Sequence, residues 1–159
     1  MELDAQHLYV ARKFFGVDED CAQLVEADAV EYVKHYRGEP FDLIIDDLFG
    51  EEAGEPVRAV AADEAWLTNL SDLLTPDGML VINFISRKDM QQCAYFSSAR
   101  LRKRFDAALQ FTTPLYVNYV LALTSAQFNA KDMHQRVNGN AVLRKARQQN
   151  KLRYHIRQL

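Results

Sequence analysis

Cysteine is scarce in this sequence, and long apolar runs are absent from it. Cys21 and Cys93 are the only cysteines among 159 residues, and they form no CxxC pair. We therefore expect neither a structural disulfide nor a zinc site, and a reducing compartment is the default. No apolar run approaches the roughly 20 residues that a membrane-spanning helix needs. The first residues also lack the layout of a signal peptide, so we predict a cytoplasmic protein.

Charge of one sign is not in large excess, because 19 Lys and Arg residues face 22 Asp and Glu residues. A formal net charge of −3 gives no overall reason to expect nucleic acid or an anionic membrane as a partner. The distribution is nevertheless uneven. Acidic residues crowd around 18–20 and 46–55, whereas the tail from Arg144 to Arg157 is basic. This tail could contact RNA, but a solvated helix face is the simpler interpretation.

Apolar spacing predicts helices and strands that alternate along the chain. The expected helices span 5–15, 28–38, 59–74 and 90–105, and the expected strands span 23–27, 41–47, 79–85, 108–112 and 115–124. Residues 50–56, rich in Gly and Glu, are expected to form a loop. Alternation of this kind is typical of an α/β fold with a largely parallel sheet. We predict one domain over 1–126 and a basic helical extension over 127–159, with Trp66, Tyr9, Phe14 and Phe15 in the core.

Four acidic residues lie where the predicted strands end or the first helix begins. They are Glu2, Asp28, Asp46 and Asp47. In doubly wound sheets, ligands bind beyond the carboxyl ends of the strands. Simpler roles are also open: Glu2 could be a solvated terminal residue, and Asp28 could be only a helix N-cap. Adjacent acids at the end of a buried strand are costly unless they are solvated or paired, and strand alternation sends them to opposite sides. A metal site from Asp46, Asp47 and Glu51 is less expected, because no histidine joins them.

The order and spacing of several short motifs carry a resemblance to a known family. The series is ELD at Glu2, a helix ending in FFG, EADA around Asp28, FDLII before Asp47, and LTPDGMLVIN from residue 74. It resembles the spermidine synthase (aminopropyltransferase) family within the class I S-adenosylmethionine-dependent methyltransferase fold. The match runs from Glu2 to about Thr124.

The resemblance implies an α/β, Rossmann-like, three-layer α/β/α fold with a mostly parallel sheet. The family's sheet order is 3-2-1-4-5-7-6, and this sequence lacks the first strand and the Gly-rich loop. We therefore expect an N-terminally truncated version of the fold. Residues 23–27 must then pair with 41–47, or strands must come from another chain, or an open sheet edge must remain.

The resemblance also implies a role for each acidic residue. Glu2 matches the carboxylate that accepts hydrogen bonds from both ribose hydroxyls. Asp28, with Ala29 beside it, matches the acid that contacts adenine, and Asp46 is assigned to the cofactor side. Asp47 matches the first acid of a D-x-x-D segment, which helps to deprotonate the attacking amine. The implied cosubstrate is S-adenosylmethionine or its decarboxylated form, and no metal is expected.

Two functions therefore stay open. The first is aminopropyl or methyl transfer to a small amine or another nucleophile, and the two transfers would use the same site. The second acid of D-x-x-D is replaced by Gly50, with Glu51 one step later, which departs from diamine recognition. The alternative is a catalytically silent partial fold that acts as a dimerising interaction module. In either case we predict a homo-oligomer and expect no membrane or nucleic acid partner.

Overall fold

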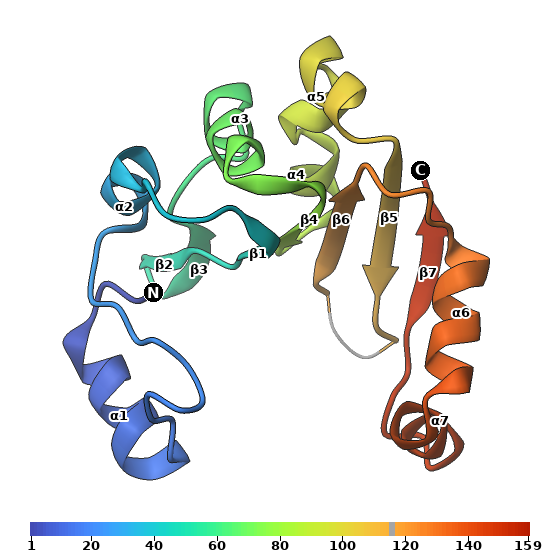
Figure 1. Cartoon of the computed structure of the whole chain (residues 1–159), viewed down its shortest axis with the longest axis horizontal. Helices are drawn as coiled ribbons and strands as arrows, with labels where there is room; N and C mark the ends of the chain where they lie inside the picture. The colour runs from blue at the N-terminus through green and yellow to red at the C-terminus, as the bar shows by residue number, and fades with distance from the viewer. Residues whose placement is uncertain (115–116) are drawn as a thin grey trace. The chain divides into compact units, whose positions relative to one another are not determined.

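The computed structural model describes residues 1–114 and 117–159 (Figure 1). The chain forms two compact units, 1–39 and 40–159. Among the described residues, no helix is both long enough and apolar enough to cross a membrane.

The first unit holds two helices, α1 (Ala5–Phe15) and α2 (Ala29–His35). The Asp4 side chain caps α1 by accepting from the backbone N–H of Gln6. Gly16 ends α1 in the left-handed region at φ +67°, which glycine adopts without steric cost. Both helices thus lie where the sequence predicts them. On α1, however, Tyr9, Phe14 and Phe15 are exposed rather than in a core, and Leu8 is the buried residue of this helix.

A single parallel bridge replaces the predicted strand 23–27. It joins Glu2 to Glu26. The N–H of Glu2 donates to the carbonyl of Val25 at 3.0 Å, and the N–H of Ala27 donates to the carbonyl of Glu2 at 3.0 Å. One paired residue on each side is too short a ladder to form a strand, so these segments are extended but not strands.

The second unit contains a five-stranded sheet in the order β1-β4-β6-β5-β7. The strands are β1 (Phe41–Asp46), β4 (Leu74–Phe84), β5 (Ala107–Thr112), β6 (Tyr119–Thr124) and β7 (His155–Gln158). Only β1 and β4 pair in parallel, and the other three pairings are antiparallel. Among the described strands, β1, β4 and β5 nevertheless run in the same direction, and β6 and β7 run opposite to them. The connections from β1 to β4 and from β4 to β5 are long crossovers, whereas β5 and β6 follow each other in sequence and pair antiparallel.

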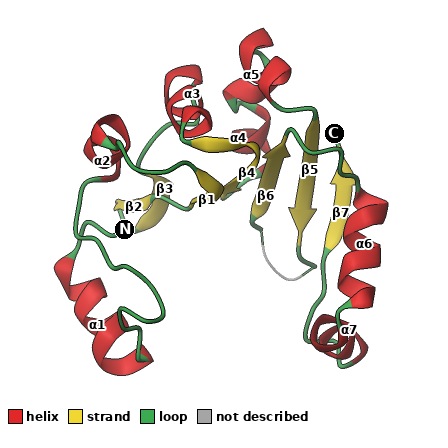
Figure 2. Ribbon diagram, viewed as in Figure 1, coloured by secondary structure: helices red, strands yellow, loops and turns green. Residues whose placement is uncertain are grey.

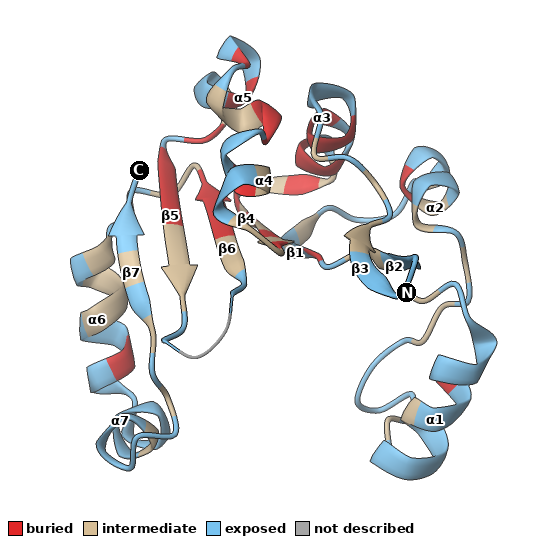
Figure 3. Ribbon diagram, turned by 180° about the vertical axis from the view of Figure 1, so that it is seen from behind, coloured by how far each residue is buried: buried red, intermediate tan, exposed pale blue. Residues whose placement is uncertain are grey.

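The same unit also contains helices connected to the strands of this sheet (Figure 2). They are α3 (Glu64–Asp72), α4 (Arg87–Gln91), the short helix η1 (Ala94–Phe96) and α5 (Ala99–Arg104). The buried positions gather on α3, on β4, β5 and β6, and on α5 (Figure 3). Alternate residues of β4, Leu80, Ile82 and Phe84, are almost completely buried. Trp66 and Leu67 of α3 are buried as well, so this core position of Trp66 is as expected.

The segment after β1 forms a β-hairpin instead of the expected loop. Strands β2 (Phe49–Glu52) and β3 (Glu55–Arg58) are antiparallel. The two turn residues, Ala53 and Gly54, have φ of +52° and +86°. Two successive residues with positive φ are the mark of a type I′ turn, whose usual signal is Asn-Gly or Asp-Gly. Because alanine occupies the first position, the sequence does not indicate this turn.

The predicted helix over 90–105 is broken into α4, η1 and α5. Ser86 caps α4, and Ser98 caps α5 by accepting from the N–H of Leu101.

The predicted helical extension holds α6 (Ala130–Gly139) and α7 (Ala141–Gln148), and its last residues form β7 beside β5. Residues 115 and 116, which belong to the last strand predicted from the sequence, lie outside the described residues.

Candidate functional site

The two acidic residues that end β1 lie on opposite sides of the strand. Asp46 is the last residue of β1 and is 3% exposed, whereas Asp47 follows it and is exposed. This is the alternation that a period of two dictates. The structure therefore separates the pair into one buried carboxylate and one accessible carboxylate at the carboxyl end of the same strand.

Asp47 begins a short chain of polar side chains along this edge of the sheet. Its Oδ1 accepts a hydrogen bond from Nδ2 of Asn83 at 2.9 Å. Oδ1 of Asn83 in turn accepts from Nδ2 of Asn118 at 3.3 Å. The three residues come from the ends of β1 and β4 and from the segment before β6. Because Asp47 keeps Oδ2 without a recorded partner among the described residues, it can still accept a proton or a hydrogen bond from a ligand.

Asp46 is held by two side chains that have no part in the site predicted from the sequence. Its Oδ2 accepts from Nη2 of Arg58 at 2.7 Å and from Nε1 of Trp66 at 3.0 Å. Within the described part of the chain, Oδ1 is buried and has no hydrogen-bond partner. A buried carboxylate needs such partners, since an unpaired buried charge is strongly unfavourable. That Asp46 binds a cofactor stays a prediction. In the structure, its hydrogen-bond partners are the side chains of Arg58 and Trp66.

Arg58 joins the β2–β3 hairpin to the sheet. Its Nη1 donates to the carbonyl of Asn83 at 2.7 Å, and its Nε donates to the carbonyl of Val60 at 3.2 Å. The guanidinium also lies 5.2 Å from the centre of the Phe84 ring, a distance at which cation–π attraction contributes. Arg58 is the one basic residue in the acidic stretch 46–58. This contrast in charge is the feature of the sequence that could have indicated Arg58 as a partner for Asp46.

A cavity of about 490 Å³ opens beside this cluster. Its wall includes Arg58, Phe84, Asp89 and the buried thiol of Cys93. Burial raises the pKa of the Cys93 thiol to about 11, because the thiolate would lose hydration there. Cys93 is therefore a neutral, unreactive thiol, as expected for a structural cysteine.

The first unit brings Glu2, Asp28 and Ala29 to neighbouring positions. The bridge from Glu2 to Glu26 places Asp28 two residues beyond the paired position. Oδ1 of Asp28 accepts from the N–H of Glu31 at 3.0 Å and caps α2, of which Ala29 is the first residue. The predicted cap is thus present, and Oδ2 has no recorded partner among the described residues.

The Glu2 carboxylate has local partners in the first unit. Its Oε1 accepts from the N–H of Asp4 at 3.0 Å, and Oε2 lies 3.4 Å from Nδ1 of His7. The hydrogen bond from Asp4 is the main reason that the pKa of Glu2 lies below its ordinary value. An ionised, partly exposed carboxylate of this kind fits a vicinal diol, which presents two donors.

The predicted site residues therefore fall into two groups. Glu2, Asp28 and Ala29 lie in the first unit, whereas Asp46 and Asp47 lie in the second. Across the described residues, no group of three or more His, Cys, Asp and Glu side chains could hold a metal ion.

A curated protein is similar to part of the chain, and no model of a protein family matches the chain. The relative is polyamine aminopropyltransferase 2 of Caldanaerobacter subterraneus subsp. tengcongensis. It is 35% identical over 63 residues, which are 38% of this chain and 21% of the relative. The matched part is thus about a fifth of that protein's length.

Solved structures with the same arrangement cover much more of the chain. A probable spermidine synthase from Corynebacterium glutamicum matches 99% of this chain and 56% of its own, with 18% identity and a TM-score of 0.69. Human methyltransferase-like protein 13 in complex with SAH matches 84% of this chain and 64% of its own, with 16% identity and a TM-score of 0.63. A spermidine synthase in complex with the transition state analogue AdoDATO matches 82% and 45%, with 19% identity and a TM-score of 0.55.

These likenesses confirm the fold class predicted from the sequence. The chain spans between about half and two thirds of the solved chains that it matches. The strand order β1-β4-β6-β5 follows the order 4-5-7-6 that the resemblance implies for the second half of the sheet. The chain therefore has the α/β, Rossmann-like fold that spermidine synthases share with class I methyltransferases.

Proposed function

We propose that this chain carries the nucleoside-binding residues and the catalytic acid of a spermidine synthase-like transferase. The observation that supports the proposal is the accessible Asp47 carboxylate at the carboxyl end of β1, oriented by Asn83 at 2.9 Å. Ligands of doubly wound sheets bind at that edge. The solved relatives were crystallised with SAH and with AdoDATO, which makes an S-adenosylmethionine-related cosubstrate the fitting class.

In this proposal the chain's own residues bind the nucleoside, orient the catalytic carboxylate and accept a proton. Glu2 accepts the ribose hydroxyls, and Asp28 accepts from the adenine amino group through its free Oδ2. Asp47 takes a proton from the attacking nucleophile through Oδ2, while Asn83 holds Oδ1. The cosubstrate supplies a sulfonium whose neighbouring carbon is the electrophile: the nucleophile forms a bond to this carbon, the carbon–sulfur bond breaks, and the sulfur leaves as a neutral thioether. Aminopropyl and methyl transfer differ only in which carbon is attacked, and the acceptor is a small amine or another nucleophile.

The test begins with calorimetric titration of the chain with S-adenosylmethionine, decarboxylated S-adenosylmethionine and 5′-methylthioadenosine. Glu2→Gln and Asp28→Asn keep the local hydrogen bonds, because asparagine is as good an N-cap as aspartate. Each should weaken nucleoside binding by about tenfold, since a charge-assisted hydrogen bond becomes a neutral one. Unchanged affinity in both variants would contradict the proposed nucleoside site.

A transfer assay then tests Asp47. Asp47→Asn should lower kcat by roughly 100-fold or more, because the general base is lost while the side chain keeps its size. Asp42→Asn is the matched control, since Asp42 is an exposed carboxylate on the same strand, where it accepts from Thr75. Equal activity of the two variants would exclude Asp47 as the base.

The silent interaction module is favoured by one specific observation. Among the described strands, β1 lies at the end of the sheet and pairs only with β4, and its residues Leu43 and Ile45 are 50% and 65% exposed. Exposed apolar edge strands associate readily. Analytical ultracentrifugation of Ile45→Lys against the unchanged chain distinguishes the two functions. A dimer that this substitution dissociates, in a protein that binds none of the three nucleosides, would favour the module. The homo-oligomer and the cytoplasmic location stay predictions.

A further inference from the structure

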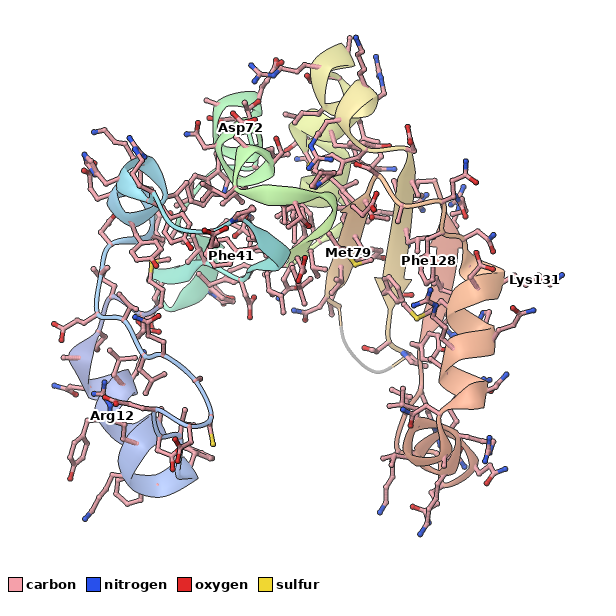
Figure 4. All side chains as sticks on the ribbon, in the orientation of Figure 1. Arg12, Phe41, Asp72, Met79, Phe128 and Lys131 are labelled. Atoms are coloured by element: carbon pink, nitrogen blue, oxygen red, sulfur yellow. The ribbon has the colours of Figure 1, made fainter. Side chains whose placement is uncertain are left out.

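The C-terminal segment 127–159 carries a strong excess of positive charge. It contains eight Lys and Arg residues and a single acidic side chain, Asp132, although the whole chain is net negative. Asp132 is engaged in the capping box of α6, where it accepts from the N–H of Asn129. Within the described residues, no ion pair involves any cation of this segment. The Lys131 side chain of α6 points away from the sheet (Figure 4).

Two of these cations converge on one residue at the junction of α6 and α7. Nη1 of Arg144 donates to the backbone carbonyl of Asn138 at 2.7 Å. Nη1 of Arg147 donates to the side-chain Oδ1 of the same residue, also at 2.7 Å. Arg144 and Arg147 are three residues apart on α7, so both lie on one face of the helix. Asn138 therefore fixes two flexible side chains next to each other, where their charges would otherwise repel.

A cavity of about 400 Å³ lies between these side chains. It is lined by Asn138, Arg144, Arg147 and Gln148, with no carboxylate among them. Each guanidinium has five N–H donors, of which one is committed to Asn138. Among the described residues, the remaining donors and the amide of Gln148 have no protein partner, so they are available to solvent or a ligand.

An aromatic stack also contacts Arg147. The guanidinium lies 5.9 Å from the centre of the Tyr154 ring. Tyr154 is itself stacked on His134, with 5.6 Å between ring centres and an angle of 19° between the planes. Arg147 is thus restrained by a hydrogen bond and by a cation–π contact, and so loses less freedom when it binds a ligand.

We propose that Asn138, Arg144, Arg147 and Gln148 form a binding site for a phosphate group. Each guanidinium fork matches two oxygens of a phosphate, and a dianion is compensated by the two cations. The volume admits a phosphate with part of its substituent. A small phosphate monoester and the backbone of single-stranded RNA are the two sources of such a group, and the same site would hold either.

Calorimetric titration of the full chain with inorganic phosphate and with adenosine 5′-monophosphate, and anisotropy with a short single-stranded RNA, tests this site. Arg144→Gln/Arg147→Gln should weaken binding by on the order of 100-fold, because two charge-assisted contacts are lost. Asn138→Ala leaves the charge unchanged and should weaken binding by about threefold to tenfold, because Arg147 loses its restraint. Lys145→Gln/Lys151→Gln is the matched control, since it removes the same charge from residues that do not line the cavity.

The outcomes are distinct. Tight binding of the monophosphate identifies a small phosphate ester, and much tighter binding of RNA identifies a nucleic acid backbone. In both cases the site requires that the arginine variant loses far more affinity than the lysine variant. Equal losses in the two variants would mean unspecific electrostatic attraction and would overturn the proposal. Affinity weaker than about 1 mM for all three probes would also overturn it.

Discussion

Replacement of Arg58 by methionine should destabilise the protein strongly, because it leaves the Asp46 carboxylate buried without its cation. The side chains of Arg58 and Asp46 are 11% and 1% exposed, and 2.7 Å separates Nη2 from Oδ2. Removing one partner of a buried ion pair costs about 3–5 kcal/mol. In Arg58→Met, Trp66 Nε1 would be the one donor left to this carboxylate among the described residues. We therefore expect a loss of about 4 kcal/mol out of a total of about 5–15 kcal/mol.

Urea denaturation followed by circular dichroism measures this loss. For a slope of about 2 kcal/mol per molar urea, the unfolding midpoint should fall by about 2 M. The double variant Asp46→Leu/Arg58→Met should recover most of the stability, because no unpaired charge remains. Arg100→Met is the control, since Arg100 and Asp72 form an exposed pair at 3.8 Å. It should cost less than about 1 kcal/mol.

Two results would refute this reasoning. The first is a cost of Arg58→Met that does not exceed that of Arg100→Met, because the burial of the pair would then be irrelevant. The second is a double variant that is no more stable than Arg58→Met alone. The loss would in that case come from the missing bonds of Arg58 to backbone carbonyls, and not from the charge of Asp46.

Three further changes have defined expected outcomes. At about pH 8, a thiol-specific reagent should modify Cys21 of the native protein rapidly and Cys93 only on unfolding, because the pKa of Cys93 is about 11 and its thiol is buried. Ala53→Asn should raise the free energy of unfolding by about 0.5–1 kcal/mol in thermal denaturation, since asparagine tolerates the positive φ of this turn position. The pKa of Glu2 is lowered in the folded state, so its contribution to stability is present above its unfolded pKa and is lost as the pH falls through the folded value. The stability difference between the unchanged chain and Glu2→Gln should therefore shrink below about pH 4, measured by urea denaturation across this range.

Local features of the fold were predictable where they depend on neighbouring residues. The period of two along FDLIIDD separates Asp46 from Asp47, and the structure has one buried and the other exposed. The bounds of α1 follow from its apolar spacing and from Gly16. The hairpin β2–β3 was missed because Ala53 occupies a turn position that asparagine or glycine usually fills. Such a choice depends on the strands that the turn connects, and local propensity alone does not reveal it.

Features that depend on distant residues were not predicted. Arg58 and Trp66 are 12 and 20 residues from Asp46, so no periodicity links them to it. β7 is four residues long and lies in a basic tail, and its strand character comes from pairing with β5. Asn83, in contrast, could have been predicted as the partner of Asp47 from the pairing of the two strands. In the parallel register Asp46 pairs with Ile82, which places the next residues, Asp47 and Asn83, side by side.

Arg58 connects the two sides of this strand end. Through Nη2 it holds the carboxylate of Asp46, and through Nη1 it holds the backbone carbonyl of Asn83. The side chain of Asn83 in turn holds Asp47. The buried acid and the accessible acid are thus parts of one hydrogen-bonded arrangement, fixed from the hairpin that directly follows them. Because the same guanidinium anchors both, the position of the exposed carboxylate depends on the buried ion pair between Arg58 and Asp46.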